Sequence, residues 1–71
     1  MIVEPDYKGY RIEINAIQVD GAWNAEVRIR RLFSEEKPHV ETITCRKPTA
    51  RAAEERGVIY ALRWVDRRPT G

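Results

Sequence analysis

Two stretches of alternating apolar and polar residues, separated by Asp20-Gly21, constrain the fold most strongly. Residues 10–16 and 23–29 each alternate with the period of a strand that buries one face. The Asp-Gly pair between them accepts the positive φ angles of a two-residue type I′ turn. The sequence therefore predicts a β-hairpin with strands over about 9–19 and 22–33.

The register of this hairpin follows from the turn, because a two-residue loop makes Val19 pair with Ala22. On the other face Glu13 then lies opposite Arg28, a favourable pair of opposite charges. The apolar residues of the core face pair with one another: Ala16 with Ala25, Ile14 with Val27 and Ile12 with Ile29. A slip of one residue would destroy this agreement.

A third strand is predicted over about 39–47, after a polar connection at 34–38 that contains a proline. A five-residue loop places Phe33 opposite His39 and Arg31 opposite Glu41. It also places Ile29 opposite Ile43 and Val27 opposite Cys45. Residues 1–8 are expected to form an irregular lead-in.

A helix is predicted over about 50–67, since Pro48 ends the strand and Thr49 is a good N-cap. Its core face carries mostly small residues: Ala50, Ala53, Gly57, Ala61 and Trp64. Gly57 lowers helix propensity, so close packing on the sheet is its expected role. The predicted fold is a single α+β domain, a three-stranded antiparallel meander followed by one C-terminal helix (βββα).

Composition narrows the classes of function. The chain has 71 residues and one cysteine, so an intrachain disulfide is excluded. Its small core makes association with another chain a plausible source of stability. The net charge is only +2, and no apolar run approaches the length of a membrane span. With no signal peptide recognisable at the start, a cytoplasmic location is expected.

No catalytic residue is assigned. His39 lacks a nucleophile at a readable spacing and is interpreted as an exposed turn residue. Cys45 is interpreted as a buried small hydrophobe, and the two residues are too few for a zinc site. The glycines are scattered singly, so no phosphate-cradling loop is present. We therefore expect no enzyme activity, metal, cofactor or small-molecule ligand.

The C-terminal half of the predicted helix has an apolar arc wider than one sheet face requires. Ile59 and Leu62 should point away from the sheet, and an exposed patch of this kind marks an interface. Tyr60 and Arg63 beside them fit interface composition. A protein-interaction module that forms a homodimer is the favoured function, with another protein as the other possible partner. In the alternative arrangement, Ile2, Val3 and Tyr7 of the N-terminal segment cover this side of the helix.

A nucleic-acid-binding domain is the alternative function. Arginine binds phosphate bidentately, and the predicted anion surface comprises basic residues of the open sheet face and the helix start: Arg28, Arg30, Arg46, Lys47 and Arg51. This function is less favoured, because Glu13 and Glu26 interrupt the positive stripe. The aromatic residues that would stack on bases are also expected on the opposite face.

The chain resembles a family of short uncharacterised bacterial proteins. Three segments carry the resemblance: YKGYRI at residues 7–12, WNAEVRIRR at residues 23–31 and WVD at residues 64–66. The resemblance covers most of the chain and rests on hydrophobic patterning. It implies three strands with one C-terminal helix, and no function.

The predicted order of elements is also similar to the last four elements of the double-stranded-RNA-binding domain. Arg46, Lys47 and Arg51 are similar to that domain's basic helix N-terminus. The chain departs from the domain in two respects: it lacks the N-terminal helix that contacts RNA, and the tight Asp20-Gly21 turn replaces a loop that reaches the minor groove. This resemblance supports the alternative function only by analogy.

Overall fold

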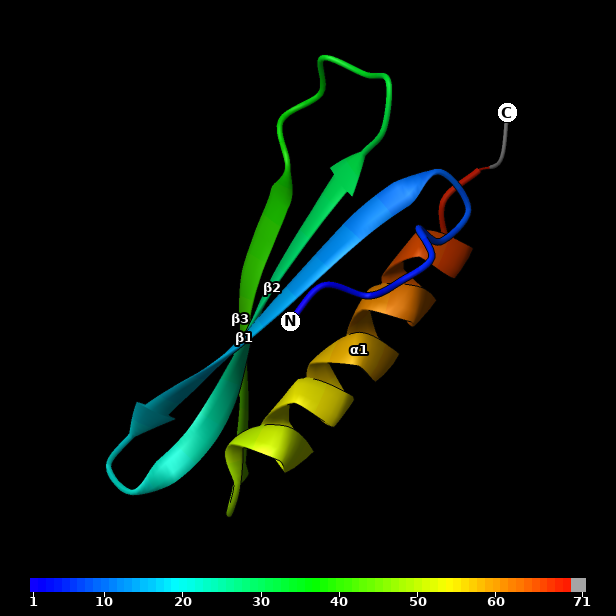
Figure 1. The fold of residues 1–71 in the computed structure, drawn as a ribbon. Coiled ribbons are helices and arrows are strands. Elements are labelled where there is room, and N and C mark those ends of the chain that lie inside the picture. Colours follow the sequence, from blue (N-terminus) through cyan, green and yellow to red (C-terminus); the bar gives the residue numbers. More distant parts are fainter. Residues whose placement is uncertain (70–71) are drawn as a thin grey trace.

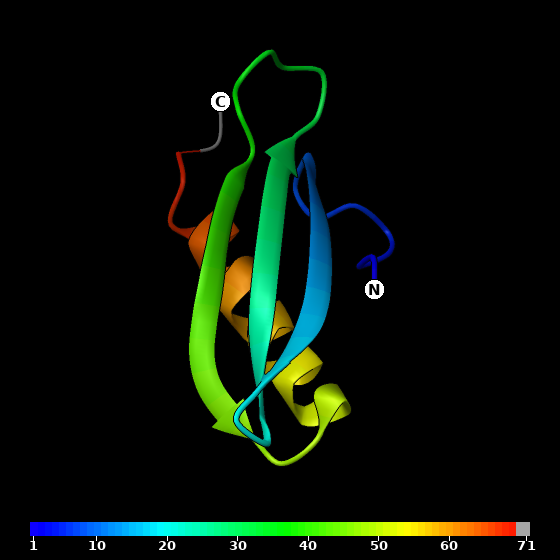
Figure 2. The same ribbon diagram turned by 90° about the vertical axis from the view of Figure 1, so that its left-hand side faces the viewer.

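A computed structural model describes residues 1–69 of the chain and shows a three-stranded antiparallel sheet with one helix across one face (Figure 1). The elements are β1 (Tyr10–Val19), β2 (Ala22–Arg31), β3 (His39–Lys47) and α1 (Ala50–Asp66). The strands lie side by side in sequence order, and α1 lies behind them in Figure 2. The fold is the predicted α+β arrangement, βββα.

The β1–β2 hairpin has the predicted turn and the predicted register. Asp20 and Gly21 have φ angles of 51° and 77°, the positive values that a type I′ turn requires. Val19 pairs with Ala22, and the pairing continues in step to Tyr10 and Arg31. The apolar partners predicted for the core face are thus correctly matched along the whole hairpin.

The core lies between this hairpin and α1. Ile12, Ile14, Val27 and Ile29 are its largest buried side chains. The buried residues of the helix are Ala53, Gly57, Ala61 and Val65, whereas Ala50 and Trp64, predicted for the same face, are half-buried. A Cβ atom added at Gly57 would lie 2.9 Å from Ile14 Cγ2 and 3.0 Å from Ala25 Cβ. Close packing against the sheet therefore accounts for this glycine.

The predicted register between β2 and β3 is wrong by four residues. Ile29 pairs with His39 instead of Ile43, and Ala25 pairs with Ile43. The physical reason is that β2 ends at Arg31 rather than at residue 33, so the connection spans residues 32–38. Four is an even number, and alternation in a strand has a period of two. Each residue before the irregular end of β3 therefore keeps its predicted face.

A backbone conformation at Phe33 accounts for the early end of β2. The backbone N–H of Leu32 still donates a hydrogen bond of 2.9 Å to the carbonyl oxygen of Gly9, which continues the β1–β2 register by one pair. Phe33 adopts a φ of 56°, a left-handed conformation that does not continue a strand, and its side chain is fully exposed. The chain thus turns away from the sheet at Phe33, whereas the sequence pattern predicted a strand through this residue.

The last residues of β3 pair irregularly with the start of β2. Ala25 pairs with Ile43 and Trp23 pairs with Lys47. A step of two residues along β2 therefore corresponds to a step of four along β3, so β3 bulges at this point. Arg46 has a φ of 48°, and its backbone N–H donates a 3.0 Å hydrogen bond to Oδ1 of the buried Asn24. Cys45 is consequently half-buried beside the Trp23 carbonyl (Sγ–O 3.6 Å), not opposite Val27 as predicted.

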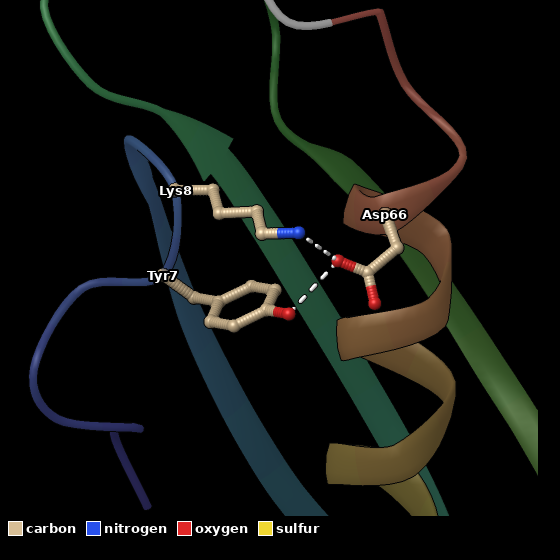
Figure 3. Close-up of polar contacts among 3 residues, drawn as sticks. All are labelled: Tyr7, Lys8 and Asp66. Carbon is tan, nitrogen blue, oxygen red and sulfur yellow. Dashed lines mark hydrogen bonds and ion pairs between the residues drawn. The ribbon is translucent and has the colours of Figure 1, made fainter.

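The N-terminal residues are more ordered than an irregular lead-in. Ile2 pairs with Glu13 of β1, and the N–H of Val3 donates a 2.9 Å hydrogen bond to the carbonyl of Ile12. Residues 1–3 therefore occupy the outer edge of β1, where Figure 2 shows the N-terminal segment. Further along, the Tyr7 hydroxyl donates a 2.8 Å hydrogen bond to Asp66 at the end of α1 (Figure 3).

Candidate functional site

The predicted self-association residues do not form one apolar patch. Ile59 is 44% exposed, but Leu62 is half-buried and packs against the core. Tyr60 is also half-buried against the core, and Arg63 is exposed. Val3, from the N-terminal segment, packs against the same core, as the alternative arrangement anticipated. Of the apolar surface expected on this side of the helix, Ile59 is the part that remains open.

The predicted anion surface separates into two distant parts. Arg28 lies opposite Val40, and Lys47 lies opposite Trp23. Arg28 and the partner of Lys47, Trp23, are five positions apart along β2, which corresponds to about 17 Å. Arg30 lies beyond Arg28, towards the 32–38 connection, whereas Arg46, Lys47 and Arg51 lie at the other end of the sheet. The five residues do not act as one surface.

A different basic surface lies on the side of α1 that faces β3. Arg56, Arg63 and Arg67 are spaced by seven and four residues, so they lie on one side of the helix. We call these three residues the basic flank. Together with Tyr60 and Trp64 they line a shallow hollow of about 150 Å³.

The acidic residues of α1 lie on its other side. Glu55 forms an ion pair with Arg51 (3.4 Å), and Asp66 binds Tyr7 and Lys8 of the N-terminal segment (Figure 3). Glu55 and Asp66 are eleven residues apart, about three turns, so they lie on the same side of α1. Both carboxylates are paired there, with Arg51 and with Lys8, and neither pairs with the basic flank.

Trp64 is the centre of an aromatic cluster beside the basic flank. His39 stacks on its ring with centroids 4.8 Å apart and an interplanar angle of 20°. The guanidinium carbon of Arg68 lies 4.0 Å from the centroid of the same ring. Tyr10 approaches it edge-on at 6.0 Å. The Trp64 indole is thus in contact with an imidazole, a guanidinium group and a second aromatic ring.

A larger hollow of about 570 Å³ lies between the 32–38 connection and the C-terminal end of α1. Trp64 lines this hollow as well as the smaller one, so the two hollows adjoin at this ring. The larger hollow is lined by further basic residues: Arg31, Lys37 and Arg68. We refer to the two hollows together as the α1–β3 groove.

His39 is not the exposed turn residue that the sequence predicted. It is the first residue of β3, its side chain is 33% exposed, and its Nε2 atom is buried without a hydrogen-bond partner. Nε2 lies 3.3 Å from Oε1 of Glu41, close enough for an ion pair when the ring is protonated. The four-residue error in register is the reason, since it placed Phe33 opposite His39 instead of Ile29.

The carboxylates near the α1–β3 groove are engaged by other groups. Burial, and after it the neighbouring Glu41 carboxylate, raise the pKa of Tyr60, so Glu41 lies beside that hydroxyl. Glu36 forms an ion pair with Arg31 at 3.3 Å. Within residues 1–69, Arg56, Arg63, Arg67 and Arg68 have no carboxylate within ion-pair distance. The positive charge of the groove is therefore largely uncompensated.

No family model, curated protein or solved structure matches this chain. In the part of the chain that the structure describes, no three His, Cys, Asp or Glu side chains gather as metal ligands would. No helix there is long and apolar enough to cross a bilayer. A function must therefore be argued from the surfaces themselves.

Proposed function

We propose that the protein binds single-stranded nucleic acid in the α1–β3 groove. The observation that carries this proposal is the basic flank, three arginines without carboxylate partners beside Trp64 and Tyr60. The alternative function expected from the sequence is thereby favoured over self-association through Ile59 and Leu62, because Leu62 packs against the core.

The spacing of the arginines suits a phosphate backbone. Arg56 and Arg67 are eleven residues apart, which corresponds to about 17 Å along a helix. Guanidinium groups bind phosphate oxygens bidentately, and each neutralised phosphate releases condensed counterions. Arg31, Lys37 and Arg68 extend the same positive surface towards the 32–38 connection.

The aromatic residues favour a single strand over a duplex. Bases of a single strand stack on aromatic rings, and such stacking contributes about 1–3 kcal/mol per base. Arg68 covers one face of Trp64 but lies beyond the end of α1 and is exposed, so a base can replace it. In a duplex the bases are paired and stacked, so they could not stack on this ring. The two-residue Asp20-Gly21 turn is also too short to reach into the minor groove of a duplex.

Fluorescence anisotropy with labelled oligouridine, oligothymidine and a duplex of equal length tests this proposal. We expect the single strands to bind at low salt and the logarithm of affinity to fall linearly with the logarithm of salt concentration. The double variant Arg63→Gln/Arg67→Gln should bind at least tenfold more weakly. It should also reduce the slope of log affinity against log salt concentration by about 1.4, because each phosphate contact with a single strand contributes ~0.7 to that slope.

A matched double variant on other surfaces, Arg28→Gln/Arg51→Gln, removes the same charge and serves as the control. It should retain the affinity of the wild type apart from the small effect of net charge. Absence of binding at low salt, or equal losses in the two double variants, would refute the proposed interface.

Self-association remains a second candidate, now favoured by the outer edge of β3. Residues 1–3 cover the edge of β1, but no segment of residues 1–69 pairs with the opposite edge of the sheet. An open edge strand is a template for pairing with a second chain. Val40 and Thr42 are exposed beside this edge, and both have high strand propensity. A homodimer would join two sheets through their β3 strands.

Light scattering after size exclusion tests this second candidate. A dimer should become a monomer in Thr42→Lys, which places a charge beside the β3 edge, and should persist in Ile59→Lys. The reverse result would return the interface to the helix patch predicted from the sequence. A wild-type monomer at high micromolar concentration would dismiss both arrangements.

A further inference from the structure

The open face of the sheet contains a pair of like charges at directly opposed positions. Arg11 of β1 pairs with Arg30 of β2, and Arg28 lies on the same face two residues along β2. Like charges directly opposite each other in an antiparallel pair destabilise a sheet. This is the one place in the hairpin where the pairing is electrostatically unfavourable, whereas Glu13 and Arg28 nearby are well matched.

The unfavourable pair is only partly compensated. Arg11 forms an ion pair with Asp6 (Nε–Oδ1 3.2 Å), and this contact raises the pKa of Arg11. Arg28 and Arg30 are exposed, and within residues 1–69 neither has a carboxylate within ion-pair distance. Arg30 therefore lies opposite another guanidinium group without a carboxylate partner of its own among residues 1–69.

These arginines lie in a hollow of about 700 Å³ between the open sheet face and the 32–38 connection. The strands supply Arg11, Arg28 and Arg30, and the connection supplies Ser34 and Lys37. Side chains held by strands present a more fixed arrangement than side chains on loops. The Ser34 hydroxyl oxygen accepts a hydrogen bond from the Glu36 backbone N–H (3.1 Å), so its own proton is free to be donated into the hollow.

We infer that this hollow binds a single phosphoryl group between Arg11 and Arg30. A doubly charged oxyanion accepts bidentate hydrogen bonds from guanidinium groups, and it would replace the repulsion between them with two attractions. Lys37 and the Ser34 hydroxyl supply further donors from the opposite wall. The ligand class is free phosphate or a small phosphate monoester.

The carboxylates around this hollow select a compact anion over a polymer. Glu13, Glu35 and Glu36 also line it, and of these Glu36 forms an ion pair with Arg31. A single phosphoryl group can sit between the guanidinium groups at a distance from these carboxylates. A strand of successive phosphates would have to pass them, so nucleic acid fits the α1–β3 groove and not this hollow.

The arginines of this site differ from those of the basic flank, although Lys37 lines both the hollow and the α1–β3 groove. The basic flank belongs to α1, which covers one face of the sheet, whereas Arg11 and Arg30 lie on the other face. A substitution at Arg30 should consequently leave oligonucleotide binding through Arg63 and Arg67 unchanged. Failure of either proposal would leave the other standing.

Thermal unfolding with and without inorganic phosphate, at constant ionic strength set with chloride, tests the inference. A ligand that binds only the folded state raises the midpoint temperature. At phosphate concentrations about ten times the Kd we expect a rise of roughly 5–10 °C for a chain of this size.

The variant Arg30→Gln should be more stable than the wild type without phosphate and should no longer be stabilised by phosphate. Without phosphate its midpoint should lie above that of the wild type, because the repulsion with Arg11 is gone. With phosphate its midpoint should no longer rise.

Arg63→Gln removes the same charge from the α1–β3 groove and should retain the full phosphate response. Glycerol 3-phosphate in place of inorganic phosphate distinguishes a monoester site, which binds both, from a site for the free ion alone.

Three results would overturn the inference. The first is a wild-type midpoint that phosphate does not raise above the chloride control. The second is an equal phosphate response in Arg30→Gln. The third is a phosphate-dependent change in amide ¹H–¹⁵N chemical shifts that avoids residues 11, 28, 30 and 34–37.

Discussion

The Tyr7 hydroxyl and the Asp66 carboxylate, 59 residues apart in sequence, are joined by a 2.8 Å hydrogen bond (Figure 3). Lys8 Nζ lies 2.7 Å from the same oxygen. Asp66 is the last residue of α1, where the helix dipole disfavours negative charge. The N-terminal segment supplies the two donors that offset this disadvantage and thereby fastens itself to the helix.

We predict that Asp66→Asn destabilises the protein at neutral pH and not in acid. Lys8 first, and Tyr7 second, lower the pKa of the Asp66 carboxyl in the folded state. A carboxyl with a depressed pKa contributes stability above its unfolded pKa and loses it as pH falls through the folded value. Urea unfolding of both proteins at pH 7 and at pH 2–3 should therefore give curves that differ at pH 7 and converge in acid. Glu55→Gln, an exposed carboxylate on the same helix, should show a smaller difference at pH 7.

A methyl group at position 57 should destabilise the fold even though alanine favours helix formation. Alanine gains about 1 kcal/mol over glycine in helix propensity. Overpacking a dense core costs about 1–3 kcal/mol, and here the added atom meets Ile14 and Ala25, both completely buried. We expect Gly57→Ala to lower the free energy of unfolding by about 1 kcal/mol in urea titrations, and Gly57→Val to lower it further. Increased stability of Gly57→Ala would show that the helix can move away from the sheet without cost.

The hairpin turn should tolerate asparagine but not a side chain at its glycine. Gly21 has a φ of 77°, and left-handed backbone costs an ordinary residue about 1–2 kcal/mol. Gly21→Ala should therefore lower the free energy of unfolding by about 1 kcal/mol, although a Cβ there would meet no other atom. Asp20→Asn is the control and should be close to neutral, because asparagine also adopts positive φ. Equal stabilities of Gly21→Ala and wild type in thermal unfolding would contradict this prediction.

The His39–Trp64 stack should need an aromatic ring and not a histidine. His39→Ala removes a ring pair that contributes about 0.5–1.5 kcal/mol beyond its buried area. His39→Phe keeps the stack and removes the buried Nε2 atom that lacks a hydrogen-bond partner. We expect urea unfolding to rank the phenylalanine variant equal to or above the wild type, and the alanine variant lowest. Loss of stability in His39→Phe would indicate that the contact of Nε2 with Glu41 contributes more than the ring.

The hairpin could be predicted because its information is local. Two residues fix the turn, and the turn fixes every pair up to Tyr10 and Arg31. The third strand depends on the length of a connection, which no nearby residue specifies. Leu32 and Phe33 continue the apolar sequence of β2, but Phe33 adopts a left-handed φ of 56°, which no turn residue in this stretch predicts.

The candidate sites were harder to predict for a related reason. The apolar arc of the helix predicted an interface there, whereas the spacing of the arginines at 56, 63 and 67 was equally present in the sequence and was not used. The position of His39 beside Trp64 depended on the register of β3 and could not be derived. The opposition of Arg11 and Arg30 followed from the correct hairpin register and could have been recognised at once.

The contact of Gly57 with Ile14 and Ala25 also bears on how this sequence can change over time. The three positions share one small volume between α1 and the hairpin. A larger residue at 57 would be accepted only by a chain in which residue 14 or 25 had already become smaller. Across any set of homologues, these three positions should therefore vary together, and their co-variation would identify relatives whose surfaces have diverged.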